Sequence, residues 1–315
     1  MTQIRSPEPT GSVVVLSRAC EAPSLALSDI SAWCTRAGLA PTGGAKVLRA
    51  GLAWEVPCGR DAISSEQLVA LREIAAAEQI DCNLVSTTAR RKKLLIADME
   101  STVIKEECLD ELAAALGIGE KIADITQRAM NAEISFEAAL RERVGLLAGL
   151  DEGVLAQLRD TGLTIMPGAR ALVATMRAHG AFCALVSGGF TYFAEPVGTA
   201  LGFDHVQANR IDIADGRLTG DVIPPILGRE AKRTALEAIA ADRGVSIGDA
   251  VCVGDGANDL AMLKAATELG GIGVAFNAKP AVAREANVRI DHSGLDALLY
   301  LQGYREAEVV TPAAA

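Results

Sequence analysis

Three short apolar stretches of this chain each end in polar residues whose types could do chemistry together. Residues 94–97 are followed by two carboxylates one residue apart, residues 183–186 by a serine and two glycines, and residues 250–253 by the segment GDGAND. Buried apolar runs of this length are typical of parallel strands, and the carboxyl ends of parallel strands meet at one edge of a sheet. We therefore expect these polar residues to converge on one crevice; they are Asp98, Glu100, Ser187, Gly188, Asp255, Asn258 and Asp259.

The chemistry that these residue types favour is phosphoryl transfer. Carboxylates from two different strands provide the hard oxygen ligands that Mg²⁺ prefers. Asp98 can attack phosphorus to give an aspartyl phosphate, while the Ser187 hydroxyl and nearby backbone amides hold the phosphoryl oxygens. Lys232, near an expected helix start, can bring a positive charge to the same phosphate. Alone, each aspartate could simply cap a turn and the lysine could be a solvated helix residue, so the interpretation depends on all of them together.

The composition excludes some classes of partner. The 315 residues include 40 acidic and 30 basic side chains, and the formal net charge of −10 argues against a nucleic-acid or anionic-membrane surface. Seven scattered cysteines show no paired metal-ligand spacing and indicate a reducing compartment. The first residues lack the apolar centre of a signal peptide, and no run approaches membrane-spanning length. We expect a cytoplasmic protein with a small-molecule substrate.

The first 90 residues predict a separate α+β unit. Strand patterns at 12–19, 45–59 and 81–88 alternate with helical patterns at 25–39 and 64–80, and the second strand stretch divides into two at Ala50 and Gly51. The resulting order βαββαβ is that of a ferredoxin-like domain. The basic run at 89–93 is interpreted as a solvated boundary, because no aromatic residue is interleaved with it.

Residues 91–305 predict a second domain with a doubly wound, Rossmann-type parallel sheet. Four short apolar strands alternate with helical segments, which is the pattern of an α/β fold. Between the first two strands, residues of about 106–165 are almost wholly helical in pattern. An insertion of this size at the catalytic edge is expected to form a helical cap that acts as a lid. Residues 306–315 are expected to be a flexible tail.

The motifs resemble those of the haloacid dehalogenase superfamily, and they occur in its order. They are DMEST at 98–102, SGG at 187–189, Lys232 and GDGAND at 254–259. Further segments are similar to the bacterial phosphoserine phosphatases within this superfamily; these are ECLDELA at 107–113, RAMNAEISFEAALRERV at 128–144, MPGA at 166–169 and LVSGGFTYFAE at 185–195. The resemblance implies a haloacid dehalogenase-like fold and hydrolysis of O-phospho-L-serine to L-serine and phosphate, the last step of serine biosynthesis.

The resemblance also implies roles for individual residues. Asp98 would be the nucleophile, Glu100 the general acid and base, and Asp255 a Mg²⁺ ligand together with Asp98 and the main-chain carbonyl of Glu100. Substrate would be bound by residues that match the family's contacts, with Thr102 and Asp259 in support; the contacts are Glu107, Met130, Phe136, Arg143, Ser187, Gly188, Lys232 and Asn258. An acid and an arginine on the lid side suit a substrate that carries an ammonium and a carboxylate beyond its phosphate.

Glu100 is a departure from the family, which usually has aspartate there. The extra methylene either misplaces the proton by about 1 Å, at a cost of up to ~10²-fold in rate, or is accommodated by the pocket. We prefer a working acid, because every other matched position is intact. The alternatives are a related phosphatase or phosphotransferase with another small phosphate, such as phosphothreonine, and a regulatory amino-acid-binding protein in which Glu100 impairs turnover.

The N-terminal unit resembles the ACT-like regulatory domains that are fused to some phosphoserine phosphatases. This likeness is one of pattern and position, since the segment contains no specific motif. Two interpretations stay open for it. The unit either senses an amino acid or forms a homodimer through its sheet edge, or it only packs against the rest of the chain.

Overall fold

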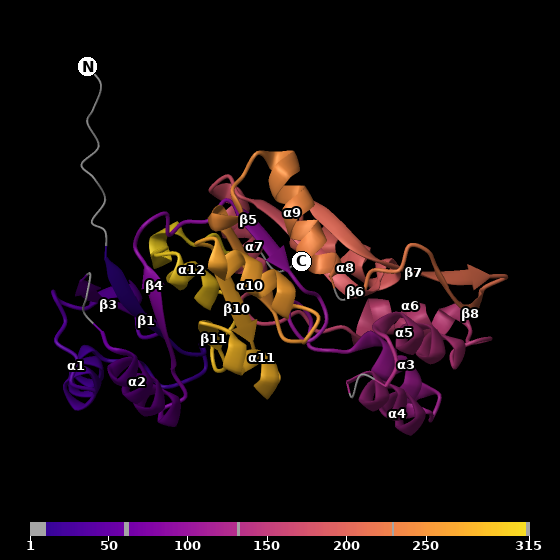
Figure 1. The fold of residues 1–315 in the computed structure, drawn as a ribbon, viewed down its shortest axis with the longest axis horizontal. Coiled ribbons are helices and arrows are strands. Elements are labelled where there is room, and N and C mark those ends of the chain that lie inside the picture. Colours follow the sequence, from indigo (N-terminus) through magenta and orange to yellow (C-terminus); the bar gives the residue numbers. More distant parts are fainter. Residues whose placement is uncertain (1–10, 60–62, 131–132, 229, 313–315) are drawn as a thin grey trace, which may run out of the picture.

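The computed structural model describes residues 11–59, 63–130, 133–228 and 230–312. Figure 1 shows a small sheet with two helices at one end of the molecule, a large sheet in the middle, and a group of short helices at the other end. No helix of the described ranges is long and apolar enough to cross a membrane. The three regions follow the order of the chain, except that the central sheet is completed by residues after the short helices.

The N-terminal unit has the expected βαββαβ order and a four-stranded antiparallel sheet in the order β2-β3-β1-β4. Ser64 begins the second helix with a capping box: its hydroxyl accepts a hydrogen bond from the amide of Gln67 at 3.1 Å, and its amide donates to Gln67 Oε1 at 2.9 Å. The sheet and helices are consistent with the predicted ferredoxin-like domain. The elements are β1 (Ser12–Ser17), α1 (Leu27–Arg36), β2 (Lys46–Arg49), β3 (Ala53–Gly59), α2 (Ser65–Ala77) and β4 (Asp81–Ser86).

The central sheet has seven strands in the order β11-β10-β9-β5-β6-β7-β8, and it is parallel except for the final pair. The predicted doubly wound fold is confirmed, and the four predicted strands are β5, β6, β9 and β10. The hairpin β7–β8 and the edge strand β11 were not predicted. The bounds are β5 (Leu94–Ala97), β6 (Phe182–Phe190), β7 (His205–Ala214), β8 (Arg217–Ile223), β9 (Ala250–Gly254), β10 (Ile272–Phe276) and β11 (Val288–Ile290).

Helices cover the central sheet, and their apolar side chains fill its two faces. Ile96 of β5 packs in a cluster with Leu236 and Met262, whereas Leu95 belongs to the core on the opposite face. This alternation follows from the period of two along a strand. The helices of this domain are α7 (Ala169–Ala178), α8 (Thr191–Leu201), α9 (Ala231–Arg243), α10 (Leu260–Glu268), α11 (Pro280–Glu285) and α12 (Ala297–Leu301), with 3₁₀ turns at Ile247–Asp249 and Glu306–Glu308.

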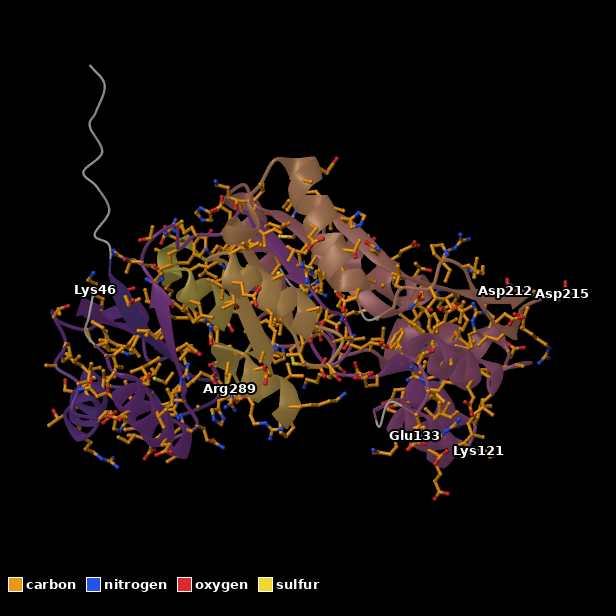
Figure 2. The ribbon with its side chains drawn as sticks, viewed as in Figure 1. Lys46, Lys121, Glu133, Asp212, Asp215 and Arg289 are labelled. Atoms are coloured by element: carbon orange, nitrogen blue, oxygen red, sulfur yellow. The ribbon has the colours of Figure 1, made fainter. Side chains whose placement is uncertain are left out.

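The predicted helical cap begins with α3, after the loop of residues 98–107 that follows β5. Its elements are α3 (Cys108–Ala115), α4 (Gly119–Met130), α5 (Phe136–Gly145), α6 (Glu152–Gln157) and a π-helical turn (Leu158–Gly162). The β7–β8 hairpin pairs with the cap through two backbone hydrogen bonds. The amide of Gly149 donates to the carbonyl of Leu218 at 2.8 Å, and the amide of Leu218 donates to the carbonyl of Leu150 at 2.9 Å. Figure 2 labels Asp212 and Asp215 at the outer end of this hairpin.

The described part of the expected tail is tied to the domain. Glu308 forms an ion pair with Arg91 at 2.6 Å, and the amide of Val310 donates to the hydroxyl of Thr175 at 2.9 Å. Residues 313–315 lie outside the described ranges.

Candidate active site

Asp98 lies directly after β5, the central strand of the large sheet. Its amide donates to the carbonyl of Val253 at 3.0 Å, which continues the pairing of β5 with β9 by one residue. Its Oδ1 accepts a hydrogen bond from the amide of Met99 at 2.7 Å. The side chain is therefore fixed in orientation, and the residue is only 5% exposed.

Lys232 connects two of the strand ends. Its Nζ lies 2.7 Å from Asp98 Oδ2 and 2.6 Å from Asp259 Oδ1, and all three residues are buried. Burial alone would lower the pKa of Lys232, but the charges of Asp259 and Asp98 outweigh it and raise that pKa above its ordinary value. The lysine is thus a fixed positive charge beside the Asp98 carboxylate.

The loop after β9 brings two more carboxylates to the same place. Asp259 accepts a hydrogen bond from the amide of Gly256 at 2.9 Å and packs against Gly254, where a side chain would collide with it. Asp255 is buried, and burial together with the charge of Asp259 raises its pKa to about 6. Both oxygens of Asp259 are used by Lys232 and Gly256, and both oxygens of Asp98 are used by Met99 and Lys232. Asp255 has a looser partner, since its carboxylate lies 3.9 Å from Lys279 Nζ.

These residues fit a magnesium ion. One oxygen each of Asp98, Asp255 and Asp259 lies within 4.8 Å of the other two, and all three residues are buried. Burial raises the pKa of Asp98, with Lys232 acting against this and the neighbouring aspartates adding to it, so the cluster carries charge repulsion that a cation would relieve. An all-oxygen donor set of this kind suits Mg²⁺. Nearby in the chain, Thr102 has a buried hydroxyl without a hydrogen-bond partner among the described residues.

The end of β6 supplies hydroxyl and amide groups. Ser187 is buried, and its Oγ accepts a hydrogen bond from the amide of Gly189 at 2.9 Å. The side-chain amide of Asn209 donates to the carbonyl of Gly188 at 2.8 Å, and its Oδ1 accepts from the amide of Leu227 at 2.7 Å. Asn209 therefore fixes the backbone of this turn. Sequence reasoning missed it, since nothing in the strand pattern of β7 marks it.

The cap reaches over this turn. A Cβ placed on Gly188 would lie 3.7 Å from the ring of Phe136 and 3.7 Å from the side-chain nitrogen of Asn258. Phe136 is the first residue of α5, so the start of that helix closes on the crevice. Met130 is the last residue of α4, but its side chain lies outside what the structure describes.

Glu100 lies between the end of the central sheet and the cap. Its Oε1 accepts a hydrogen bond from the amide of Cys108 at 2.9 Å, and Cys108 is the first residue of α3. The amide at a helix start favours a carboxylate at this point. Burial, followed by the charge of Glu107, raises the pKa of Glu100 to about 7. A carboxyl group with this pKa can both donate and accept a proton near neutral pH.

Glu107 and Arg143 lie on the cap side of the same crevice. The hydroxyl of Ser101 donates to Glu107 Oε1 at 2.8 Å, and Ser101 has a φ of +53°, in the left-handed region that non-glycine residues seldom adopt. Burial lowers the pKa of Arg143, while the charges of Asp110, Glu100 and Glu107 act against this. An arginine and an acid thus face one region under the cap. Ser101 and Cys108 were not predicted, because their importance depends on contacts with the acids.

The predicted residues fall into three groups that the contacts connect. Asp98, Lys232, Asp255 and Asp259 form the charged centre, Ser187 and Gly188 lie at the turn with Asn258 and Phe136 beside it, and Glu100, Glu107 and Arg143 lie toward the cap.

Curated relatives are similar over most of this chain. A phosphoserine phosphatase of Mycobacterium tuberculosis is 40% identical over 243 residues, which are 76% of this chain and 58% of the relative. A probable phosphoserine phosphatase of Schizosaccharomyces pombe is 40% identical over 243 residues, 76% of this chain and 80% of the relative. The chain spans 58–60% of the length of several curated relatives that it matches, including those of Streptomyces coelicolor and Vibrio cholerae.

Solved structures agree with this assignment of the fold. A hydrolase of the HAD family from Salmonella enterica serovar Typhi superposes with a TM-score of 0.81 at 27% identity, over 92% of this chain and 98% of the other. A probable phosphoserine phosphatase from Vibrio cholerae gives a TM-score of 0.74 at 31% identity, over 95% and 88%. The family model described as haloacid dehalogenase-like hydrolase matches residues 95–264, more than half of the chain. The chain therefore belongs to the haloacid dehalogenase-like hydrolases.

Proposed function

We propose that this protein is a Mg²⁺-dependent phosphatase that hydrolyses O-phospho-L-serine to L-serine and phosphate, the last step of L-serine biosynthesis. The observation that carries the proposal is the buried charged centre, in which Lys232 lies 2.7 Å from Asp98 and the Asp255 carboxylate lies beside them. The names of curated relatives support the substrate, since several are phosphoserine phosphatases at about 40% identity.

In the first half of the reaction, Asp98 is the nucleophile. A carboxylate oxygen of Asp98 forms a bond to phosphorus while the bond from phosphorus to the serine oxygen breaks. Glu100 donates its proton to the departing oxygen, which avoids release of a serine alkoxide. Lys232 balances negative charge on the phosphoryl group, with the Ser187 hydroxyl and backbone amides of the turn holding its oxygens.

In the second half, water attacks the phosphorus of the aspartyl phosphate. Glu100 has lost its proton in the first half and now accepts one from this water, so that the acid and base roles alternate. The bond between phosphorus and the Asp98 oxygen breaks and the carboxylate is restored. A bound Mg²⁺, held by Asp98, Asp255 and the Glu100 carbonyl, would neutralise charge on the phosphoryl oxygens.

The cap side of the crevice would select the amino acid. Glu107 would bind the ammonium group of phosphoserine and Arg143 its carboxylate, while Phe136 and Met130 would provide apolar contacts. Ser101 holds the Glu107 carboxylate at 2.8 Å, which reduces its freedom before substrate binds. The buried position of Arg143 strengthens its interaction with a carboxylate, because solvent screens the pair less.

A comparison of small phosphates tests this proposal. The purified protein with Mg²⁺ should hydrolyse phosphoserine with a much higher kcat/KM than phosphoethanolamine, which lacks the carboxylate, or 3-phosphooxypropanoate, which lacks the ammonium group. Replacing Arg143 by leucine should abolish the preference over the compound without a carboxylate. It should largely keep the preference over the compound without an ammonium group. Release of phosphate from sugar phosphates but not from phosphoserine would contradict the proposed substrate.

The alternatives have their own signatures. Formation of phosphohomoserine in place of free phosphate, with homoserine present, would indicate a phosphotransferase with the same nucleophile. A higher kcat/KM for phosphothreonine than for phosphoserine would identify phosphothreonine as the preferred substrate of the same reaction. Binding of serine without turnover of any phosphate ester would favour a regulatory protein.

A further inference from the structure

Gly189 lies against the carboxylate of Glu100. A Cβ built on Gly189 would lie 2.7 Å from Oε2, 3.0 Å from Cδ and 3.1 Å from Oε1 of Glu100. The φ of Gly189 is outside the left-handed region, so the backbone itself would accept an alanine here. Gly189 is buried near the end of β6, two residues after Ser187. The Glu100 carboxylate, and not the backbone conformation, therefore disfavours a side chain at position 189.

The other side of the same carboxylate is held by the cap. Glu100 Oε1 accepts a hydrogen bond from the amide of Cys108, the first residue of α3, at 2.9 Å. The carboxylate is thus confined between Cys108 and Gly189, one in the cap and one in the central sheet. An aspartate is shorter by one methylene and would not extend as far from the backbone at position 100 toward Gly189.

We propose that Gly189 is a positioning residue for Glu100, because its missing side chain is the space that this longer acid requires. The inference rests on the proposed role of Glu100 in proton transfer. It also gives a physical reason why the longer acid fits at position 100, since the end of its side chain occupies the space beside Gly189. The backbone amide of Gly189 donates a hydrogen bond to the Ser187 hydroxyl. An alanine at position 189 could donate the same hydrogen bond.

A methyl group at position 189 would move the acid and leave the fold intact. The atoms that it meets are the far end of a flexible side chain, which can rotate to another position without a shift of the backbone. The displaced carboxylate would lose the Cys108 amide and its alignment with the leaving oxygen. A displacement of about 1 Å in a catalytic group costs up to ~10²-fold in rate.

Four proteins test the inference: the wild type, Gly189→Ala, Glu100→Asp and the double variant. Each is measured as kcat/KM for phosphoserine and for an aryl phosphate, whose leaving group departs without a proton donor. We expect Gly189→Ala to lower kcat/KM for phosphoserine by about tenfold or more and that for the aryl phosphate by less than about threefold. In the Glu100→Asp background, Gly189→Ala should lower kcat/KM for phosphoserine by less than about threefold.

The matched control is Gly119→Ala, at a glycine with open space around it at the start of α4. It should leave kcat/KM for both substrates unchanged and should not lower the melting temperature, because alanine is a better helix former than glycine. If alanine at position 189 lowers phosphoserine turnover by the same factor in both backgrounds, the methyl acts on the turn itself and the inference is wrong. No loss in the Gly189→Ala variant would overturn it as well.

A second measurement is independent of turnover. The Cys108 amide should exchange its hydrogen faster in Gly189→Ala than in the wild type, because its acceptor has moved; an unchanged exchange rate would contradict the inference. A failure of the proposed function looks different. If Glu100→Gln kept full activity on phosphoserine, Glu100 would not be the proton donor, whatever the effect of Gly189→Ala on Cys108.

Discussion

Glu100 reaches its partners with one methylene more than an aspartate at the same position would have. The structure gives this longer acid an amide donor at Cys108 and an open position at Gly189. The sequence identified the acid and its departure from the family, but the two contacts could not be predicted. They join residues that are close in space through a helix start and a strand end, and neither residue type indicates such a contact by itself.

The raised pKa of Glu100 predicts a difference between substrates in their pH dependence. Burial and Glu107 raise this pKa to about 7, so Glu100 carries its proton below that pH and loses it above. A poor leaving group needs the proton, so kcat/KM for phosphoserine should fall as pH rises above about 7. For an aryl phosphate, kcat/KM should stay level over the same range, in which both substrates are dianions. Identical profiles for the two substrates would contradict the role of Glu100.

Ser101 offers a test of substrate selection at the residue scale. Its hydroxyl donates a hydrogen bond to Glu107 at 2.8 Å, and Ser101→Ala should free the carboxylate that we propose binds the ammonium group. Loss of one such hydrogen bond costs about 1 kcal/mol, so KM for phosphoserine should rise by about fivefold. The kcat/KM for an aryl phosphate, which has no ammonium group, should not change. Equal losses for both substrates would mean that Ser101 acts on the catalytic loop instead.

At the scale of elements, the buried strands were predictable and the hairpin was not. Strands β5, β9 and β10 are apolar runs that are buried along their whole length, and such runs stand out in a sequence. In the hairpin β7–β8, only Asn209 and Ile211 of β7 are buried, and β8 alternates roughly between buried and exposed residues, so the apolar pattern is weaker. Its turn did carry a signal, since Asp215 and Gly216 both have positive φ, as the Asp-Gly turn of a hairpin requires.

The ends of β5 and β9 bring together the proposed metal ligands Asp98 and Asp255, and this gives a prediction that does not depend on activity. Mg²⁺ binds the folded state, so adding it should raise the melting temperature of the wild type by several degrees at saturation. Asp255→Asn removes a ligand and should abolish most of this rise. The control Asp242→Asn changes an exposed acid of α9 and should show the same rise in melting temperature with Mg²⁺ as the wild type. The same rise in Asp255→Asn as in the wild type would exclude Asp255 as a ligand.

At the scale of the whole molecule, the N-terminal unit shares a core with the catalytic domain. One face of its sheet, with Val14 and Leu16, packs against its own helices, whereas Val13 and Val15 on the other face belong to the same core as Leu298 of α12. The edge strands also meet. The side chain of Asn83 pairs with both backbone groups of Arg289 in β11, at 2.7 and 2.9 Å, and Figure 2 labels Arg289 at this boundary.

The interpretation of residues 89–93 as a solvated boundary was wrong for two of its members. Arg90 forms an ion pair with Glu55 at 2.6 Å and donates to two carbonyls of the helix α12 region. Lys92 is 5% exposed, and its Nζ donates to the carbonyls of Gly248 and Gly270. Charge alone suggested solvent, but long side chains can be buried where carbonyls receive them. For Arg90, these carbonyls come within reach only through the docking of the two units, which the sequence does not reveal.

Asp81 forms hydrogen bonds between the N-terminal unit and the catalytic domain. Its buried carboxylate accepts hydrogen bonds from the amides of Asp291 at 2.7 Å and Ser293 at 2.8 Å, in the loop after β11. Asp81→Ala would leave these amides unsatisfied and should lower the free energy of unfolding by about 3 kcal/mol. The kcat for phosphoserine should not change, because β10 and β9 separate this loop from β5.

Denaturant unfolding and steady-state kinetics check this prediction. The control Asp291→Ala removes an exposed acid from the same loop, whose side chain pairs only with Arg289 at the surface among the described contacts, and it should cost less than about 0.5 kcal/mol. Equal stability of Asp81→Ala and Asp291→Ala would show that the contact does not hold the two units together.

The central claim concerns reaction, nucleophile and substrate, and one measurement addresses all three. Magnesium-dependent release of phosphate is measured from L-phosphoserine beside an aryl phosphate and a sugar phosphate, with Asp98→Asn as the control. We predict a strong preference for phosphoserine, which is lost without Mg²⁺ and abolished in Asp98→Asn, because the amide cannot serve as the nucleophile. Phosphate release from phosphoserine that persists in Asp98→Asn, or activity confined to the sugar phosphate, would contradict the account.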